Sequence, residues 1–326
     1  MSDTSFTRHR RSRYASFSRD MVRETKVGVE NLIYPIFVQQ DDGTTPIPSL
    51  PGIHRYGGTA LRHHVHEAAA RGIQMIALFP VIDSELKTED CAEAFDPNNL
   101  ICRTIKSLKD QTPDMGLLTD VALDPYNPNG QDGFVDPDGT VNNDRTLDAL
   151  VAQARVLAQA GADVLGPSDM MDGRVGAIRH MLESAGHDRT LILSYAAKYA
   201  SSLYGPFRDA VGSRGALKGD KKSYQMDPAN RSEALREIQT DLEEGADWVM
   251  VKPGHTYLDI IRECKTAFDV PTFAYHVSGE YAMWAFAAAA GALDRQASLK
   301  EILLSFRRAG ADGILTYTAF EAAELL

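Results

Sequence analysis

A recurring phrase along the chain joins an Ala-rich amphipathic segment, a glycine and a short apolar stretch. Four copies are readable: EAAARGIQMIALFP from Glu67, AQAGADVLGPSD from Ala158, LEEGADWVMVKPG from Leu242 and RRAGADGILTYTA from Arg307. The glycine stands where a helix C-terminus favours a left-handed residue, so each phrase predicts a helix followed by a strand. The apolar stretches lack polar alternation, which is typical of parallel strands covered by helices on both faces.

Four further apolar stretches, 31–38, 115–121, 190–195 and 271–276, lie before the first phrase and in the three intervals between the phrases. Eight strands with intervening helices predict an α/β protein of the (β/α)8 TIM barrel class, with residues 31–326 as one catalytic domain. A doubly wound open sheet is the alternative. No G-x-G-x-x-G follows the first strand, which counts against that alternative.

Residues 1–30 lie outside this pattern and form a polar, basic segment that contains RHRRSR from Arg8. One interpretation is a disordered tail, and the other is an arm that packs on a neighbouring subunit. Asp3, Asp20 and Glu24 dilute the positive charge, which disfavours a transit peptide or an RNA-binding tail. We therefore expect an extended N-terminal arm with a role in oligomer contacts.

Composition narrows the class of protein. The chain is 44% hydrophobic and 24% charged, as expected of a folded globular protein, and its net charge of -11 argues against nucleic acid as a partner. No apolar run approaches the roughly 18 residues that a membrane helix needs. The three cysteines, Cys91, Cys102 and Cys264, are odd in number and too widely spaced for a metal cluster or a disulfide framework, which favours the cytoplasm.

Two lysines stand where a barrel enzyme places its catalytic groups, at the C-terminal ends of strands. Lys198 follows TLILSYAA and Lys252 follows ADWVMV, on the predicted fifth and sixth strands. Neighbouring strands bring two such amines close together, and partial desolvation beside a second ammonium lowers the pKa of a lysine. The pair is thus a candidate for nucleophilic amines, whereas a single strand-end lysine more often reaches into solvent.

Several segments around these lysines resemble a known family. They are SYAAKYASSLYGPFRDA from Ser194, MVKPG from Met250, YHVSGEYAM from Tyr275 and RRAGADGILTY from Arg307, and they are similar to the active-site segments of porphobilinogen synthases, or 5-aminolevulinate dehydratases. The likeness extends from the arm through GPSDMMDGR to the last strand. It implies the condensation of two molecules of 5-aminolevulinate to porphobilinogen with loss of two waters, a step of tetrapyrrole biosynthesis.

The resemblance also implies a role for each matching residue. Lys252 would carry the substrate that becomes the propionate side of the product, and Lys198 the one that becomes the acetate side. Arg208 and Lys221 would bind the carboxylate of the Lys198-bound substrate. Ser278 and Tyr317 would hold the other carboxylate through hydroxyl groups, although ordinary loop hydrogen bonding is an alternative for both.

The segment DVALDPYNPNGQDG, from Asp120, departs from the zinc-dependent members of the family. Those members carry three cysteines where this chain has Ala122, Asp124 and Asp132, so no tetrahedral zinc site is expected. The two aspartates suit a hard cation such as Mg²⁺, or act directly on the substrate amine, and the sequence leaves both open. Asp120 is a candidate for holding the amine or relaying protons; turn formation explains part of the same segment.

Two further expectations come from the aspartate-rich, magnesium-type members. Glu237, in NRSEALREIQTD, matches a glutamate that binds an allosteric Mg²⁺ near a subunit interface, whereas a solvated helix face is the alternative. The family's usual assembly is a homo-octamer whose arms wrap neighbours.

The basic, glycine-rich segment 199–224 is interpreted as a lid that excludes water, with a disordered insertion as the alternative.

Two other functions remain open at this point. A single-lysine Schiff-base aldolase also uses a barrel lysine but needs only one amine. A catalytically silent assembly protein on the same barrel would need neither.

Overall fold

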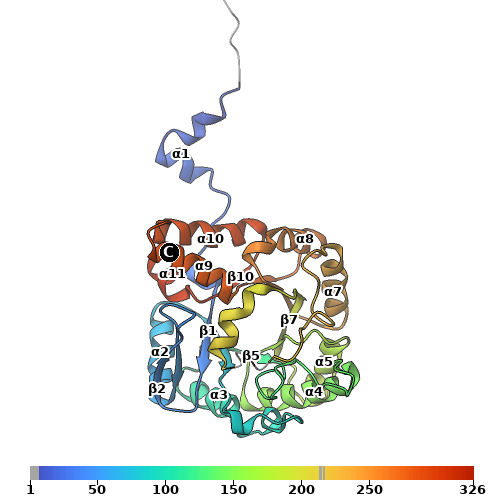
Figure 1. The fold of residues 1–326 in the computed structure, drawn as a ribbon. Helices are drawn as coiled ribbons and strands as arrows, with labels where there is room; N and C mark the ends of the chain where they lie inside the picture. Colours follow the sequence, from blue (N-terminus) through green and yellow to red (C-terminus); the bar gives the residue numbers. More distant parts are fainter. Residues whose placement is uncertain (1–6, 213–214, 216) are drawn as a thin grey trace, which may run out of the picture.

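A closed ring of parallel strands forms the centre of the molecule (Figure 1). The computed structural model describes residues 7–212, 215 and 217–326. The first barrel strand pairs with the last, with Leu32 opposite Ile314, and this pairing closes the ring and excludes the open-sheet alternative. The barrel strands are β1 (Leu32–Val38), β4 (Met75–Pro80), β5 (Gly116–Val121), β6 (Val164–Pro167), β7 (Leu191–Lys198), β8 (Trp248–Lys252), β9 (Thr272–His276) and β10 (Gly313–Thr316).

Helices surround the ring, as the repeated phrases predict. Gly161 and Gly310 end their helices with φ of 105° and 118°, a left-handed conformation that glycine adopts without a steric penalty. The α-helices outside the arm are α2 (Gly58–Ala70), α3 (Leu100–Gln111), α4 (Asn143–Ala160), α5 (Arg174–Ser184), α6 (Gly205–Ala210), α7 (Ser232–Glu243), α8 (Leu258–Phe268), α9 (Ser278–Ala289), α10 (Arg295–Ala309) and α11 (Ala319–Leu325). Among the described residues, no helix is long and apolar enough to cross a membrane.

Two short strands were not predicted from the sequence. β2 (Gly43–Pro46) and β3 (His54–Gly57) form an antiparallel pair, and β3 also pairs in parallel with the end of β1. Neither strand is an apolar run: β2 is largely exposed, and β3 is half-buried except for the buried Gly57. Hydrophobic periodicity therefore gives no signal for them.

The arm extends away from the barrel (Figure 1). Its described part contains a short 3₁₀ helix, η1 (His9–Arg13), and α1 (Ser16–Met21), and no residue of either is buried. Tyr14 and Met21 are 92% and 83% exposed. Residues 1–6 of the predicted arm lie outside the described residues.

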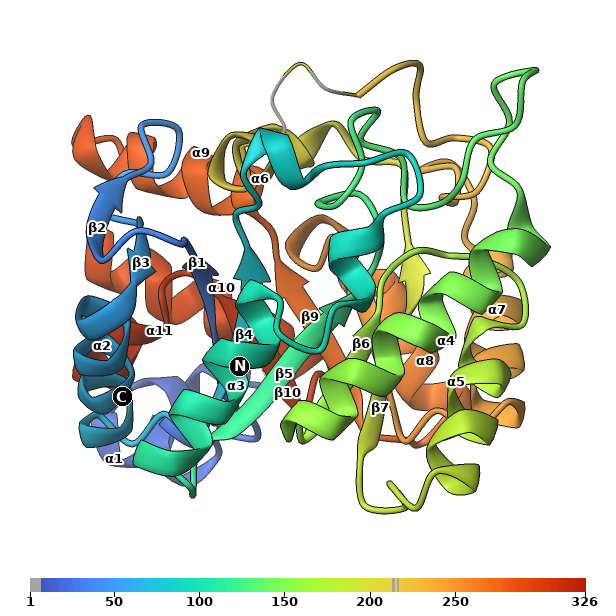
Figure 2. The same ribbon diagram turned by 90° about the horizontal axis from the view of Figure 1, so that it is seen from below.

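The loops that follow the strands gather at one end of the barrel (Figure 2). α6 lies across this mouth in both views, so it covers the space above the strand ends (Figures 1 and 2). The remaining 3₁₀ helices are η2 (Val29–Asn31), η3 (Ser84–Leu86), η4 (Ala92–Phe95), η5 (Ser202–Tyr204) and η6 (His255–Tyr257). This end of a (β/α)8 barrel is where catalytic groups are placed.

Candidate active site

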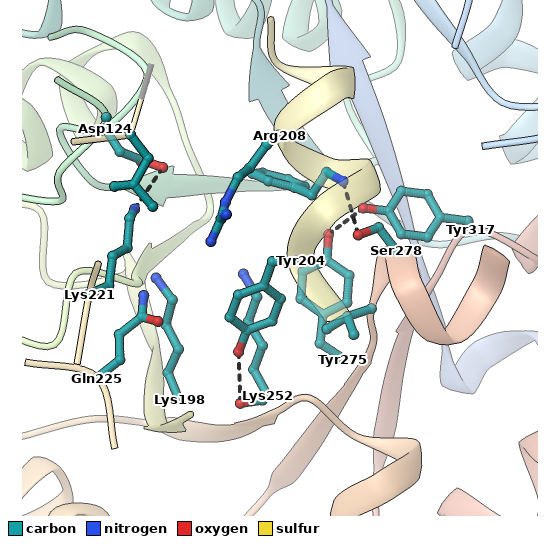
Figure 3. Close-up of a pocket in the computed structure, with 14 residues that line it drawn as sticks. Asp124, Lys198, Tyr204, Arg208, Lys221, Gln225, Lys252, Tyr275, Ser278 and Tyr317 are labelled. Carbon is teal, nitrogen blue, oxygen red and sulfur yellow. Dashed lines mark hydrogen bonds and ion pairs between the residues drawn. The ribbon is translucent and has the colours of Figure 1, made fainter. Parts of the chain in front are cut away.

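Lys198 and Lys252 lie side by side as the last residues of β7 and β8, where they are direct register partners. The register shifts between Ser194 and Ala197, where β7 contains one residue more than β8. Because side chains alternate along a strand, this bulge determines which residues face the same side. Both lysines consequently line the same cavity at the mouth of the barrel (Figure 3).

Lys252 is buried among aromatic rings. Its Nζ lies 4.8 to 5.4 Å from four ring centroids, those of Tyr195, Tyr204, Phe207 and Tyr275. Burial, followed by repulsion from the Lys198 ammonium, lowers the pKa of Lys252 to about 7. A substantial fraction of this amine is therefore neutral, and nucleophilic, near neutral pH.

Lys198 has polar neighbours instead. Its Nζ donates to the Ser168 carbonyl oxygen and lies 3.7 Å from Asp132 Oδ1. The Ser168 hydroxyl in turn donates to Asp120 Oδ2 at 2.9 Å. Ser168 thus contacts both a predicted nucleophile and a predicted proton carrier, and nothing in the sequence singled it out.

The carboxylates at the mouth differ in their electrostatics. Burial raises the pKa of Asp120 to about 6, although both lysines oppose the rise. Burial also acts on Asp132, but Lys198 and Lys221 outweigh it and hold the pKa of Asp132 below its ordinary value. Lys221 Nζ lies 2.9 Å from Asp132 Oδ2 and 3.3 Å from Asp124 Oδ2, so one ammonium bridges two carboxylates.

The residues predicted to bind carboxylates line the cavity together with both lysines (Figure 3). Arg208 extends from α6 into the space between Lys221 and Lys252 (Figure 3). Ser278 Oγ accepts from Phe207 N at 3.0 Å and donates to the Leu203 carbonyl oxygen at 3.3 Å. The cations and the hydroxyls therefore lie in different parts of one cavity.

A second cavity adjoins the first. It shares Lys198, Lys252, Asp124 and Phe207 with the first and adds other groups, among them Asp120, Asp132 and Ser168. Carboxylates, a hydroxyl and two amines consequently meet in one connected space. Such a set can form imines and move protons between neighbouring atoms.

The aromatic residues around Lys252 were not predicted from the sequence. Tyr195 and Tyr275 belong to β7 and β9, and Tyr204 and Phe207 come from the segment across the mouth. Tyr317 was predicted for its hydroxyl, which lies 3.0 Å from that of Tyr275. An aromatic residue near a strand end is a weak signal by itself, because most such rings only fill the core.

Glu237 lies outside both cavities, on the barrel helix α7. Burial raises the pKa of this half-buried carboxyl; Arg174 opposes the rise, and Asp241 and Asp172 add to it. Among residues 7–212, 215 and 217–326, no group of three or more His, Cys, Asp or Glu side chains is arranged to hold a metal ion. A site at Glu237 would therefore rely on few protein ligands.

Comparison with known families extends over almost the whole chain. The family model of delta-aminolevulinic acid dehydratase matches residues 6–325. The chain belongs to this family. A delta-aminolevulinic acid dehydratase of Bradyrhizobium diazoefficiens is 51% identical over 320 residues, covering 98% of this chain and 90% of the relative. The chloroplastic enzyme of Glycine max is 48% identical over 323 residues, covering 98% and 77%.

A solved member of the dehydratase family has the same fold. It is the enzyme of Toxoplasma gondii, also named porphobilinogen synthase, in complex with its reaction product porphobilinogen. The identity is 48% and the TM-score 0.97, with 99% of this chain and 92% of that chain covered. The (β/α)8 barrel expected from the sequence is thereby confirmed.

Proposed function

We propose that this chain condenses two molecules of 5-aminolevulinate to porphobilinogen, with each substrate held on one lysine. The observation that carries the proposal is the register pairing of Lys198 and Lys252 within one cavity. A single-lysine aldolase needs no second amine at this place, and a silent assembly protein needs neither. Family membership and the paired amines together favour the condensation.

The two lysine amines explain the loss of two water molecules in the reaction. Attack of each lysine amine on a substrate ketone forms an imine and releases the ketone oxygen as water. Protonated imines make the neighbouring C–H bonds acidic, which favours a carbon–carbon bond between the two substrates. The amino group of one substrate then closes the ring on the other, and both lysine amines leave. Lys252, with its pKa near 7, is ready to attack first.

Proton transfer falls to the carboxylates. Asp120 has a pKa of about 6 and is hydrogen-bonded to the Ser168 hydroxyl, so it can accept and return a proton near neutral pH. Asp124 and Asp132 form ion pairs with Lys221, and they are positioned to receive the ammonium group of a substrate. Arg208 and Lys221 supply positive charge for a substrate carboxylate in a protein that is acidic overall.

The donor set at the active site fits a hard cation better than zinc. Cys91, Cys102 and Cys264 are buried and line neither cavity, so the anionic groups available there are carboxylates, those of Asp124 and Asp132 with Asp120 beside them. When bound there, Mg²⁺ would supply positive charge that orients an amine or a carboxylate. We assign the chain to the magnesium-type members on this basis.

Glu237 is the proposed allosteric magnesium ligand. Asp241 and Asp172 contribute negative charge around it, and Mg²⁺ usually keeps several waters while binding one or two carboxylates.

The exposed Tyr14, Phe17 and Met21 support an arm that packs on a neighbouring subunit of a homo-octamer. The buried free cysteines fit a cytoplasmic location.

Turnover of 5-aminolevulinate, with and without Mg²⁺, tests the function. We expect pyrrole formation, loss of part of it on chelation, and recovery with Mg²⁺ but no special benefit from zinc. Glu237→Ala should remove stimulation by Mg²⁺ and its binding in calorimetry, while sparing basal turnover. Absence of pyrrole from the Mg²⁺-loaded protein would favour the silent assembly protein, and borohydride trapping on one lysine alone at saturating 5-aminolevulinate would favour the aldolase.

A further inference from the structure

A buried carboxamide joins the loop after β5 to the segment that follows α6. Gln131 is 5% exposed, and its Nε2 donates to the carbonyl oxygens of Lys218 and Asp220 at 2.8 and 3.1 Å. Its Oε1 accepts from the Tyr224 hydroxyl at 2.6 Å. All three partners belong to the described segment 217–225, so one side chain uses both its donor and its acceptor on that segment.

The loop that carries Gln131 is itself held in place. The Asn127 side chain, also buried, donates to the Leu123 and Gln131 carbonyl oxygens at 2.9 and 2.7 Å. Its Oδ1 accepts from the backbone N–H of Gly130 at 2.7 Å. Buried, satisfied hydrogen bonds of this kind make a loop rigid. Gln131 therefore ties the segment 217–225 to a fixed anchor.

The segment 217–225 contains Lys221, whose ammonium group lies in the cavity. Lys221 lies between the Gln131 contacts at Asp220 and Tyr224, and its ammonium bridges Asp124 and Asp132. The Tyr224 hydroxyl accepts from Asp132 N at 3.2 Å, and Gln225 Nε2 lies 3.4 Å from Asp132 Oδ2. The segment thus meets the same loop through polar contacts on either side of Lys221.

We propose that Gln131 is a positioning residue that latches the segment 217–225 over the active site and so places the Lys221 ammonium for a substrate carboxylate. The proposal deepens the proposed function and rests on it for the identity of the carboxylate. The latch itself depends only on the contacts of the carboxamide. Only a side chain with a donor and an acceptor in this geometry satisfies both the two carbonyls and the phenol.

Two substitutions distinguish the hydrogen bonds made by Gln131 from the packing of its side chain. Gln131→Glu keeps the size and the acceptor, but its carboxylate faces two carbonyl oxygens and should release the segment. Acidification protonates the introduced carboxyl, restores a donor, and should recover part of the loss relative to the unmodified protein at the same pH. Tyr224→Phe removes one hydroxyl and serves as a milder second variant. Gln111→Glu, on the exposed face of α3, is the matched control.

Trypsin cleavage after Lys218 and Lys222, both exposed, reports the latch without substrate. Loss of two or three hydrogen bonds should make cleavage of Gln131→Glu about tenfold faster, with a similar increase in KM for 5-aminolevulinate and a smaller change in kcat. Unchanged cleavage, or faster cleavage with an unchanged KM, would overturn the proposal. Failure of the proposed function itself is seen separately, as absence of pyrrole from the unmodified protein.

Discussion

The two candidate nucleophiles are register partners on adjacent strands, yet their surroundings differ. Lys252 lies among four aromatic rings and forms no ion pair with a described carboxylate. Lys198, one strand away, donates to the Ser168 carbonyl oxygen and lies near Asp132. One amine is thus surrounded by apolar groups and the other by hydrogen-bond acceptors.

This difference separates the tasks of the two amines. Desolvation disfavours the ammonium form of Lys252, so its amine is available to a ketone without any local base. Lys198 must first give up its contacts with Ser168 and Asp132, which also place it beside the groups that move protons. The comparison therefore predicts that Lys252 reacts first and independently, and that Lys198 depends on its acceptors.

The largest expected effect comes from removing either amine. Lys252→Met and Lys198→Met should each lower porphobilinogen formation by at least about 10⁴-fold, because a substrate without its lysine amine cannot form the imine that activates it. Borohydride trapping followed by peptide mass analysis should still label Lys252 in Lys198→Met. Lys300→Met, on the exposed side of α10, is the control and should retain activity. Full turnover in either active-site variant would refute the two-lysine mechanism.

The pH dependence of trapping sharpens the comparison further. Lys252 is protonated and unreactive below its pKa of about 7 and neutral above it. The initial rate of trapping on Lys252 in the unmodified protein, read by peptide mass analysis, should therefore rise with pH and level off above about pH 8, by roughly a hundredfold between pH 5 and pH 9. Removal of the Lys198 charge in Lys198→Met should raise the midpoint pH. The midpoint should stay below the ordinary pKa of a lysine, because burial still disfavours the ammonium form. A rate that keeps rising beyond pH 9 would contradict the apolar environment.

Sequence periodicity predicted the barrel because all eight strands lie in apolar runs beside helices. It placed Lys198 after its strand rather than in it, and it gave no sign of the bulge between Ser194 and Ala197. A bulge is a property of strand pairing, so one strand's sequence alone does not display it. The sequence therefore predicted only that the two lysines lie on adjacent strands. The strand register shows that they are direct partners.

The site residues divide in the same way. Lys198 and Lys252 stand out in the sequence as charged residues at predicted strand ends, whereas Arg208 and Lys221 were assigned through the family resemblance of their segments. Tyr195, Phe207 and Gln131 act through what surrounds them, and their partners come from distant parts of the chain. Such residues are distinguishable from ordinary core and loop residues only after folding brings the partners together.

A third prediction compares the two carboxylate-binding regions. Arg208→Ala should raise KM by about tenfold to a hundredfold, since charged hydrogen bonds contribute about 1.5–3 kcal/mol. Ser278→Ala should raise it only a few-fold, because a neutral hydroxyl contributes roughly 1 kcal/mol. Steady-state kinetics over a wide range of 5-aminolevulinate measures both. Arg262→Ala, exposed on α8, should leave KM unchanged, and equal effects of Arg208→Ala and Ser278→Ala would remove the distinction.

The smallest expected effect tests the aromatic surroundings directly. Phe207, whose ring centroid lies 5.4 Å from Lys252 Nζ, also packs edge-on against Phe79. Phe207→Asn should admit water, raise the pKa of Lys252, and slow trapping a few-fold at pH 7 but not at pH 9. Phe207→Leu keeps the apolar contact and should preserve the pH profile. If both variants slow trapping equally at the two pH values, packing of α6 rather than desolvation of the amine explains the effect.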